Sequence, residues 1–111
     1  MDDTGKYLPE IYRSFRSRFA DVVERHDAVA GAVEAAGPLD DHTLRLVKLG
    51  IAVGAQSEGA VRSNVRKALD VGVTREAIEQ VILLGLTTRG FPATVAAWQW
   101  ASEVWSNRED Q

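Results

Sequence analysis

The fold follows from residues 39–72, which read LDDHTLRLVKLGIAVGAQSEGAVRSNVRKALDVG. The first half of this segment is apolar almost all round a helical wheel, which predicts a central helix that Asp40 or Asp41 caps. A second helix is expected over about residues 58–70. Gly72 suits the left-handed position just beyond a helix end. The segment therefore predicts two helices joined by a short turn.

The sequence on either side of this pair is helical as well. Toward the C-terminus, Thr74 can cap a helix that residues 89–92 (RGFP) stop, and a last helix follows. Toward the N-terminus, apolar residues recur three and four positions apart over residues 8–23, which predicts a helix with one buried stripe. A break at residues 24–27 and a short helix over 28–36 complete the expected elements.

These elements predict one all-α domain, a bundle of five to six helices over residues 9–106. Residues 1–8 are expected to be a flexible N-terminus. The last helix is expected to fray after Ser106, which makes residues 107–111 a frayed C-terminus. No internal repeat and no linker interrupts the chain.

Composition excludes several classes of protein. The 111 residues carry a net charge of −3 and contain no cysteine, which argues against nucleic acid as a partner and excludes disulfides and thiolate sites. His26 and His42 lack metal-ligand spacing and are expected on the solvated surface, so neither a metal nor a cofactor is predicted. No segment is apolar and long enough for a membrane span, and a cytoplasmic protein with no membrane partner is expected.

Four separated residues match the spacing of a known active site. Arg45 is followed after twelve residues by Ser57, and then by Ala60 and Asn64. The frame around them, over the last two thirds of the chain, resembles the carboxymuconolactone decarboxylase and alkylhydroperoxidase D-like family. The matching frame comprises Leu39-Asp40 and residues 64–69, 71–76 and 90–93. The resemblance implies an alkylhydroperoxidase D-like helical bundle that forms a homo-oligomer: a dimer, a trimer or a hexamer.

The same four positions have lost the residues that the hydroperoxidase branch uses. The resemblance implies a glutamate, two cysteines that cycle through a disulfide, and a histidine at these places. Ser57 and Ala60 cannot form a disulfide, Asn64 has no pKa near neutrality, and Arg45 reverses the charge of the glutamate. The decarboxylase branch keeps the histidine that Asn64 replaces, although its reaction needs no redox centre.

The candidate site residues are polar side chains in and around this segment. Arg45 lies on an otherwise apolar helix, so we expect it to be at least partly buried and to need an anionic partner. An internal ion pair is the more frequent case, with Glu58, Glu76 or Glu79 as partner, and a ligand carboxylate or phosphate is the alternative. Arg45, Asn64 and Arg89 form the predicted ligand-binding set. Glu58 is the possible general acid, and Ser57 is interpreted as a turn or capping residue.

Two further patterns concern packing. Gly50 and Gly54 lie four residues apart on one helix face, which predicts a close approach of another helix. Trp98, Trp100 and Trp105 are too many for one small bundle to bury, so part of this apolar surface is expected to meet another subunit.

Three functions follow from these observations. The first is a carboxymuconolactone decarboxylase-like protein without thiol peroxidase chemistry that binds a small, carboxylated or otherwise anionic ligand in the relic pocket. The second is a non-redox enzyme of the lactone decarboxylase or lyase type. The third is an alkylhydroperoxidase-type antioxidant protein, which the absence of cysteine disfavours most. The sequence favours the first, because no side chain at the four positions titrates near pH 7.

Overall fold

The computed structural model describes residues 10–109, with side chains as far as Arg108. Contacts group the chain into two units that divide between Pro38 and Leu39, and each unit is described by itself. The described residues form helices and turns without a strand, which confirms the all-α prediction. The flexible segment predicted over residues 1–8 lies outside the described residues. The single domain predicted over residues 9–106 stays a prediction.

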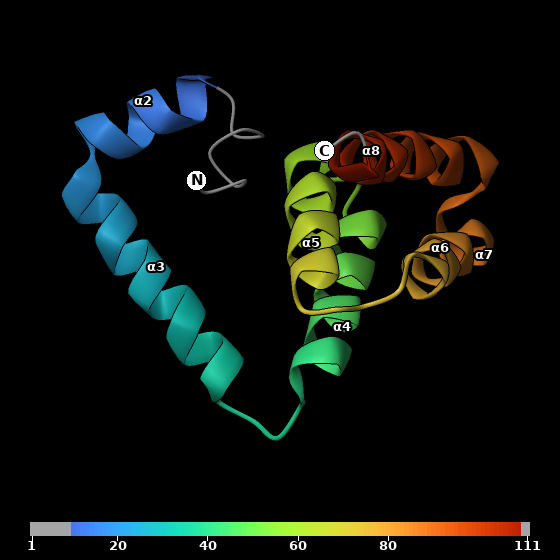
Figure 1. Cartoon of the computed structure of the whole chain (residues 1–111), viewed down its shortest axis with the longest axis horizontal. Helices are drawn as coiled ribbons and strands as arrows, with labels where there is room; N and C mark the ends of the chain where they lie inside the picture. Colours follow the sequence, from blue (N-terminus) through green and yellow to red (C-terminus); the bar gives the residue numbers. More distant parts are fainter. Residues whose placement is uncertain (1–9, 110–111) are drawn as a thin grey trace. The chain divides into compact units, whose positions relative to one another are not determined.

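The first unit consists of α2 (Glu10–Arg18) and α3 (Ala20–Ala35), drawn in blue and teal in Figure 1. The chain breaks at Phe19, with φ −122° and ψ 48°, so the break predicted at residues 24–27 is wrong. Those residues contain neither glycine nor proline, and charged side chains are compatible with a helix. An ion pair at 2.8 Å between Arg16 on α2 and Asp27 on α3 links the two helices.

The buried stripe predicted for the N-terminal helix is also wrong. No residue of α2 or α3 is buried, and Ile11, Phe15 and Val22 are exposed. The spacing of the apolar residues identified the helix correctly, but one helix face becomes a core only when another layer covers it. Two helices provide no such layer within this unit.

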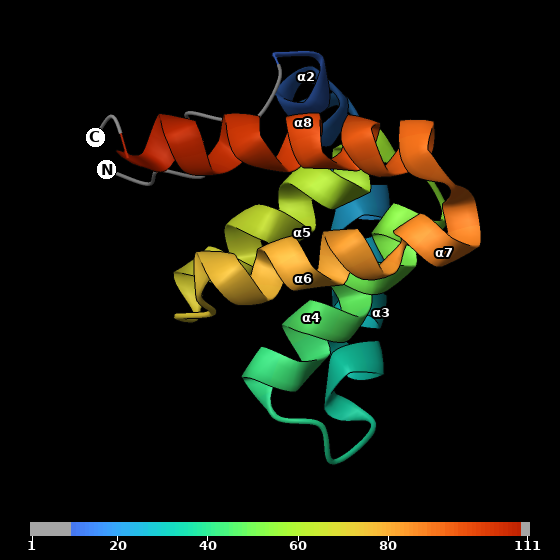
Figure 2. The same ribbon diagram turned by 90° about the vertical axis from the view of Figure 1, so that its right-hand side faces the viewer.

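The second unit packs five helices (Figures 1 and 2): α4 (Asp41–Gly54), α5 (Glu58–Asp70), α6 (Arg75–Leu84), the single turn α7 (Leu86–Arg89) and α8 (Phe91–Glu109). Figure 2 shows α5 and α6 between α4 and α8, and both helices contact both of these neighbours. The core lies where the four long helices meet. Its largest fully buried side chains are Leu49, Val61, Val65, Ile78 and Ile82.

Most helix ends of this unit agree with the sequence signals, but the helix that Thr74 caps ends at Leu84 and the separate turn α7 reaches the stop expected at residues 89–92. Asp40 accepts a hydrogen bond from the backbone N–H of Thr43 at 2.8 Å, and Thr74 caps α6 by accepting from Ala77 at 3.2 Å. Gly72 and Gly90 follow α5 and α7 with φ of +88° and +92°, a region that glycine enters without strain. The predicted start and end of α5 are confirmed.

Helix α8 continues to Glu109, three residues beyond Ser106, where fraying was expected. An ion pair at 2.8 Å between Arg108 and Asp70 joins this last turn to the end of α5. The three tryptophans differ in burial, as expected. Trp105 is buried and its ring lies edge-on to that of Trp98, with the guanidinium of Arg75 4.5 Å from the Trp105 ring centre. Trp98 remains 41% exposed.

Two expectations for α4 fail. The helix is not buried all round, because Val47 and Ile51 are 47% and 65% exposed. Gly50 and Gly54 do not serve a close helix contact: a Cβ at Gly50 would lie 3.8 Å from Val81, and one at Gly54 would meet nothing within 4 Å. The close contact is made instead at Gly85, where a Cβ would lie 3.1 Å from Val53.

Candidate functional site

The four positions that match the family spacing lie on α4 and α5. Arg45 on α4 and Asn64 on α5 are both 7% exposed, so the expected burial of Arg45 is confirmed. Ser57 is the N-cap residue of α5, but its side chain makes no capping hydrogen bond and is exposed. Ala60 is half-buried. The structure thus places two polar side chains in the interior and leaves the serine in solvent.

Asn64 is anchored to its own helix. Its Nδ2 donates to the backbone carbonyl of Ala60 at 2.9 Å, while its Oδ1 is buried and has no hydrogen-bond partner. A buried carbonyl oxygen that lost its water without gaining a donor is destabilising. Asn64 therefore does not occupy an optimised polar network, and it offers no group that could exchange a proton near neutral pH.

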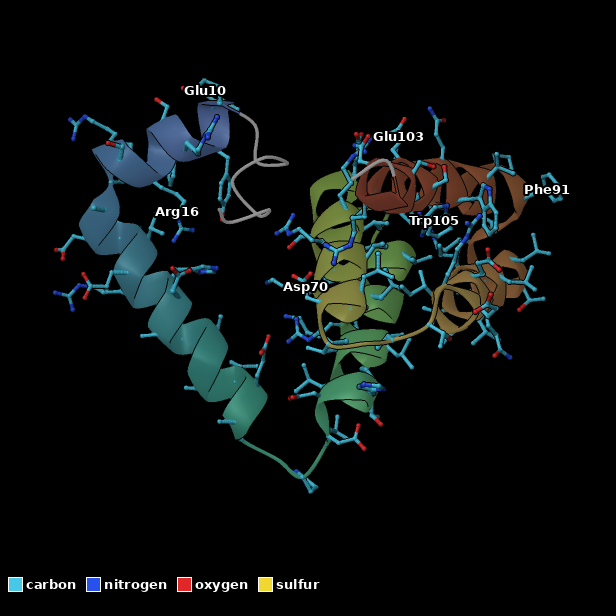
Figure 3. All side chains as sticks on the ribbon, in the orientation of Figure 1. Glu10, Arg16, Asp70, Phe91, Glu103 and Trp105 are labelled. Atoms are coloured by element: carbon cyan, nitrogen blue, oxygen red, sulfur yellow. The ribbon has the colours of Figure 1, made fainter. Side chains whose placement is uncertain are left out.

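Glu58, the predicted acid, is an exposed ion-pair residue. Its carboxylate lies 3.1 Å from Arg62, which also pairs with Glu103 on α8 at 2.5 Å (Figure 3). Partial burial works against the charge of Arg62, but hydrogen bonds to Glu103 and Glu58 outweigh it and raise the pKa of the guanidinium. The Arg62–Glu103 pair joins α5 to α8, and Glu58 pairs with the same Arg62 within α5. A carboxyl that acts as a general acid near neutral pH needs to be desolvated, whereas the carboxyl of Glu58 is exposed.

A groove runs between α4 on one side and α6 and α7 on the other, with a volume of about 390 Å³. Most of its lining is apolar, and Arg89 is the charged residue of the lining. Arg45, Ser57 and Asn64 are not among the lining residues. Those residues are Leu46, Val47, Gly50, Val53, Gly54, Val81, Leu84, Gly85, Thr88 and Arg89.

Glycines keep this groove open. Gly50 lies inside α4 and Gly54 is its last residue; both line the groove, and neither is required by a neighbouring backbone. Glycine in a helix interior destabilises the helix by roughly 1 kcal/mol relative to alanine. A side chain at either position would project into space that the fold leaves empty, so the glycines preserve a bare backbone surface beneath the groove.

Arg89 stands at the C-terminus of α7 and reaches across to the α4–α5 turn. Its Nη2 donates to Oε1 of Gln56, and both side chains are exposed. A cation at this end of an otherwise apolar groove can attract an anionic group. Of the three predicted ligand-binding residues, Arg89 is the one that the structure places at a groove. The assignment of Arg45 and Asn64 to a ligand stays a prediction.

The histidines are exposed, as expected, but His42 has a defined role. Its Nε2 lies 2.7 Å from the backbone oxygen of Val71, which ties the start of α4 to the end of α5. Within residues 10–108, no group of three or more His, Cys, Asp or Glu is arranged to hold a metal ion. None of the described helices has the length and apolarity needed to cross a membrane.

Sequence reasoning missed the groove. Its signal was present in Gly50 and Gly54, but a glycine pair on a helix face fits a packed contact and an open surface equally well. The structure distinguishes a packed contact from an open surface, because a Cβ at Gly50 would lie 3.8 Å from Val81, an ordinary contact distance. Gln56 was also missed, because nothing in its sequence context places it next to Arg89.

Comparison with protein families gives one match. The model of the carboxymuconolactone decarboxylase family matches residues 20–103, which span α3 to most of α8 and leave α2 outside the match. No curated protein and no solved structure matches the chain.

Proposed function

We propose that this chain, which belongs to the carboxymuconolactone decarboxylase family, binds a small anionic ligand in the groove between α4 and α6–α7 and performs no thiol peroxidase chemistry. The observation that carries the proposal is the combination of Arg89 with a groove that helix glycines hold open. The chain contains no cysteine, so it has no thiol of its own to reduce a peroxide.

The groove has the size and polarity of a small-molecule site. Its volume of about 390 Å³ falls within the range of roughly 300–1,000 Å³ that is common for ligand pockets. Valine and leucine side chains supply apolar walls, and Arg89 supplies the polar group that would orient a ligand. A compact acid with an apolar body matches this arrangement better than a polyanion, because the lining contains one cation.

Binding is favoured over catalysis by the kind of polar residue that the fold buries. Among residues 10–108, the buried polar side chains are Arg45 and Asn64, and no carboxylate is among them. Neither an arginine nor an asparagine acts as a general acid or base near pH 7. A lactone decarboxylase or lyase would need a proton donor at the site, and the groove lining does not supply one.

The proposal is tested by calorimetric titration of benzoate, muconate and inorganic phosphate into the wild type and two variants. Arg89→Ala removes the cation and should weaken acid binding by about tenfold or more, as expected for loss of a charge-assisted hydrogen bond. Gly54→Leu should abolish binding by filling the groove. This variant should fold, because leucine forms helix better than glycine.

Matched controls separate local from general effects. Gly59 lies on α5, away from the groove, and a Cβ there would meet nothing within 4 Å; Gly59→Leu should bind as the wild type does. Arg25 is an exposed arginine of α3, and Arg25→Ala should also be neutral. Binding that survives both Arg89→Ala and Gly54→Leu would refute the assignment of the ligand to this groove.

A further inference from the structure

We infer that Gln56 sets the affinity of the proposed groove by competing with the ligand's anionic group for the guanidinium of Arg89. The inference rests on the proposed function, and it adds a residue that lies outside the groove lining. Gln56 lies in the α4–α5 turn, directly before Ser57, the N-cap residue of α5. Its Oε1 accepts a hydrogen bond from Nη2 of Arg89.

The geometry gives this contact a defined place. Arg89 is contributed by α7, whereas Gln56 belongs to the turn between α4 and α5, so their hydrogen bond joins the two sides between which the groove lies. A ligand whose acid group engages Arg89 must either share the guanidinium with Gln56 or displace it. Displacement is feasible because both side chains are exposed, and the freed amide can bond to water.

The backbone holds Gln56 firmly at this position. Its φ of +53° makes it the one residue other than glycine with a positive φ among the described residues. The backbone N–H of Gln56 donates to the carbonyl of Val53 at 3.1 Å, and the next N–H, of Ser57, donates to Ala52 at 3.2 Å. These bonds terminate α4 and fix where the Gln56 side chain starts.

Electrostatics favours an anion over Gln56 as the partner of the Arg89 guanidinium. The amide of Gln56 is neutral, so its bond to Arg89 is charged on one side only. A carboxylate brings a full opposite charge and can accept two parallel N–H bonds from the guanidinium. A neutral ligand gains no such advantage over Gln56. Competition by Gln56 thus selects anions over neutral analogues of the same shape.

Two substitutions at this position test the inference, with benzoate and its neutral analogue benzamide as probes in calorimetric titrations at fixed pH and salt. Gln56→Ala removes the competitor but retains a side chain with a Cβ in the left-handed region. It should bind benzoate about three to ten times more tightly. Gln56→Glu places a carboxylate, ionised at neutral pH, beside Arg89 and should weaken benzoate binding at least tenfold. Gln80→Ala, an exposed glutamine of α6 outside this groove, should bind as the wild type does.

The outcomes distinguish this inference from the proposed function. If benzoate binds and needs Arg89, but Gln56→Ala leaves the affinity unchanged or lowers it, then Gln56 is not a competitor and the inference is overturned. If wild type and Gln56→Ala both fail to bind benzoate, muconate and phosphate, the proposed function itself fails. A gain for benzamide equal to the gain for benzoate in Gln56→Ala would also overturn the inference, because it would show relief of crowding rather than release of charge.

Discussion

At the scale of single residues, Asn64 occupies the position at which the family resemblance implies a histidine. It is 7% exposed, its Nδ2 bonds to the carbonyl of Ala60 four residues earlier, and its Oδ1 has no partner. A polar residue retained for stability would have both ends of its amide satisfied. The position is therefore an interior site whose polar side chain cannot transfer a proton near neutral pH.

The unsatisfied oxygen leads to a stability prediction. Asn64→Leu replaces the amide by an apolar group of similar size and removes the buried acceptor without a partner. We expect the free energy of unfolding to rise by about 1 kcal/mol, which is the scale of an unsatisfied buried polar group. Urea denaturation followed by tryptophan fluorescence measures this difference. A loss of 1 kcal/mol or more would mean that Oδ1 meets a donor, such as a bound molecule, in solution.

At the scale of helices, the cap of α4 makes stability depend on pH. The backbone N–H of Thr43 donates to Asp40, and this bond holds the pKa of the Asp40 carboxyl below its ordinary value. A carboxyl with a lowered pKa in the folded state stabilises the fold above its ordinary pKa. That stabilisation is lost as the pH falls through the folded-state value.

Asp40→Asn provides the test, because asparagine caps a helix as well as aspartate does but does not titrate. Between pH 6 and pH 3, the Tm of the wild type should fall further than the Tm of Asp40→Asn. Circular dichroism melts of both proteins at the two pH values measure the difference. Equal losses would show that the Asp40 cap contributes nothing to the acid sensitivity.

The helix boundaries show how far sequence reasoning reaches. Asp40, Thr74 and Gly72 act locally, through one hydrogen bond or one dihedral angle. Thr74 and Gly72 were identified correctly, and Asp40 was one of the two residues offered as the cap of α4. Burial was predicted less well, because it depends on which elements meet. Ile51 has the apolar character of a core residue and is 65% exposed. The groove was missed for the same reason, because it depends on how α4, α6 and α7 pack against one another.

At the scale of the whole molecule, large apolar side chains remain uncovered. In the second unit, Ile51, Leu83 and Leu84 are at least 60% exposed, and Phe91 at the start of α8 is 69% exposed (Figure 3). Exposed apolar groups at this density on a small unit are typical of surfaces that meet another protein. The homo-oligomer expected from the family resemblance would provide such a surface, and it stays a prediction.

Light scattering after gel filtration tests this prediction. The wild type should elute with a mass above the 12.2 kDa of one chain. Ile51→Glu and Leu83→Glu should lower that mass, because a charge in an apolar interface is not solvated. Gln99→Glu, an exposed position of α8, should not change it. A wild type of single-chain mass at micromolar concentration would contradict the prediction.

The central claim is that the ligand site lies in the groove rather than at the four positions that match the spacing of the family's active site. Amide NMR spectra recorded during a benzoate titration test it most directly, because glycine amides report on the bare surface of α4. The account predicts saturable shifts at Gly50, Gly54, Gly85, Thr88 and Arg89, with smaller changes at Arg45 and Asn64. Shifts centred on Arg45, Ser57 and Asn64, with the groove glycines unmoved, would contradict it.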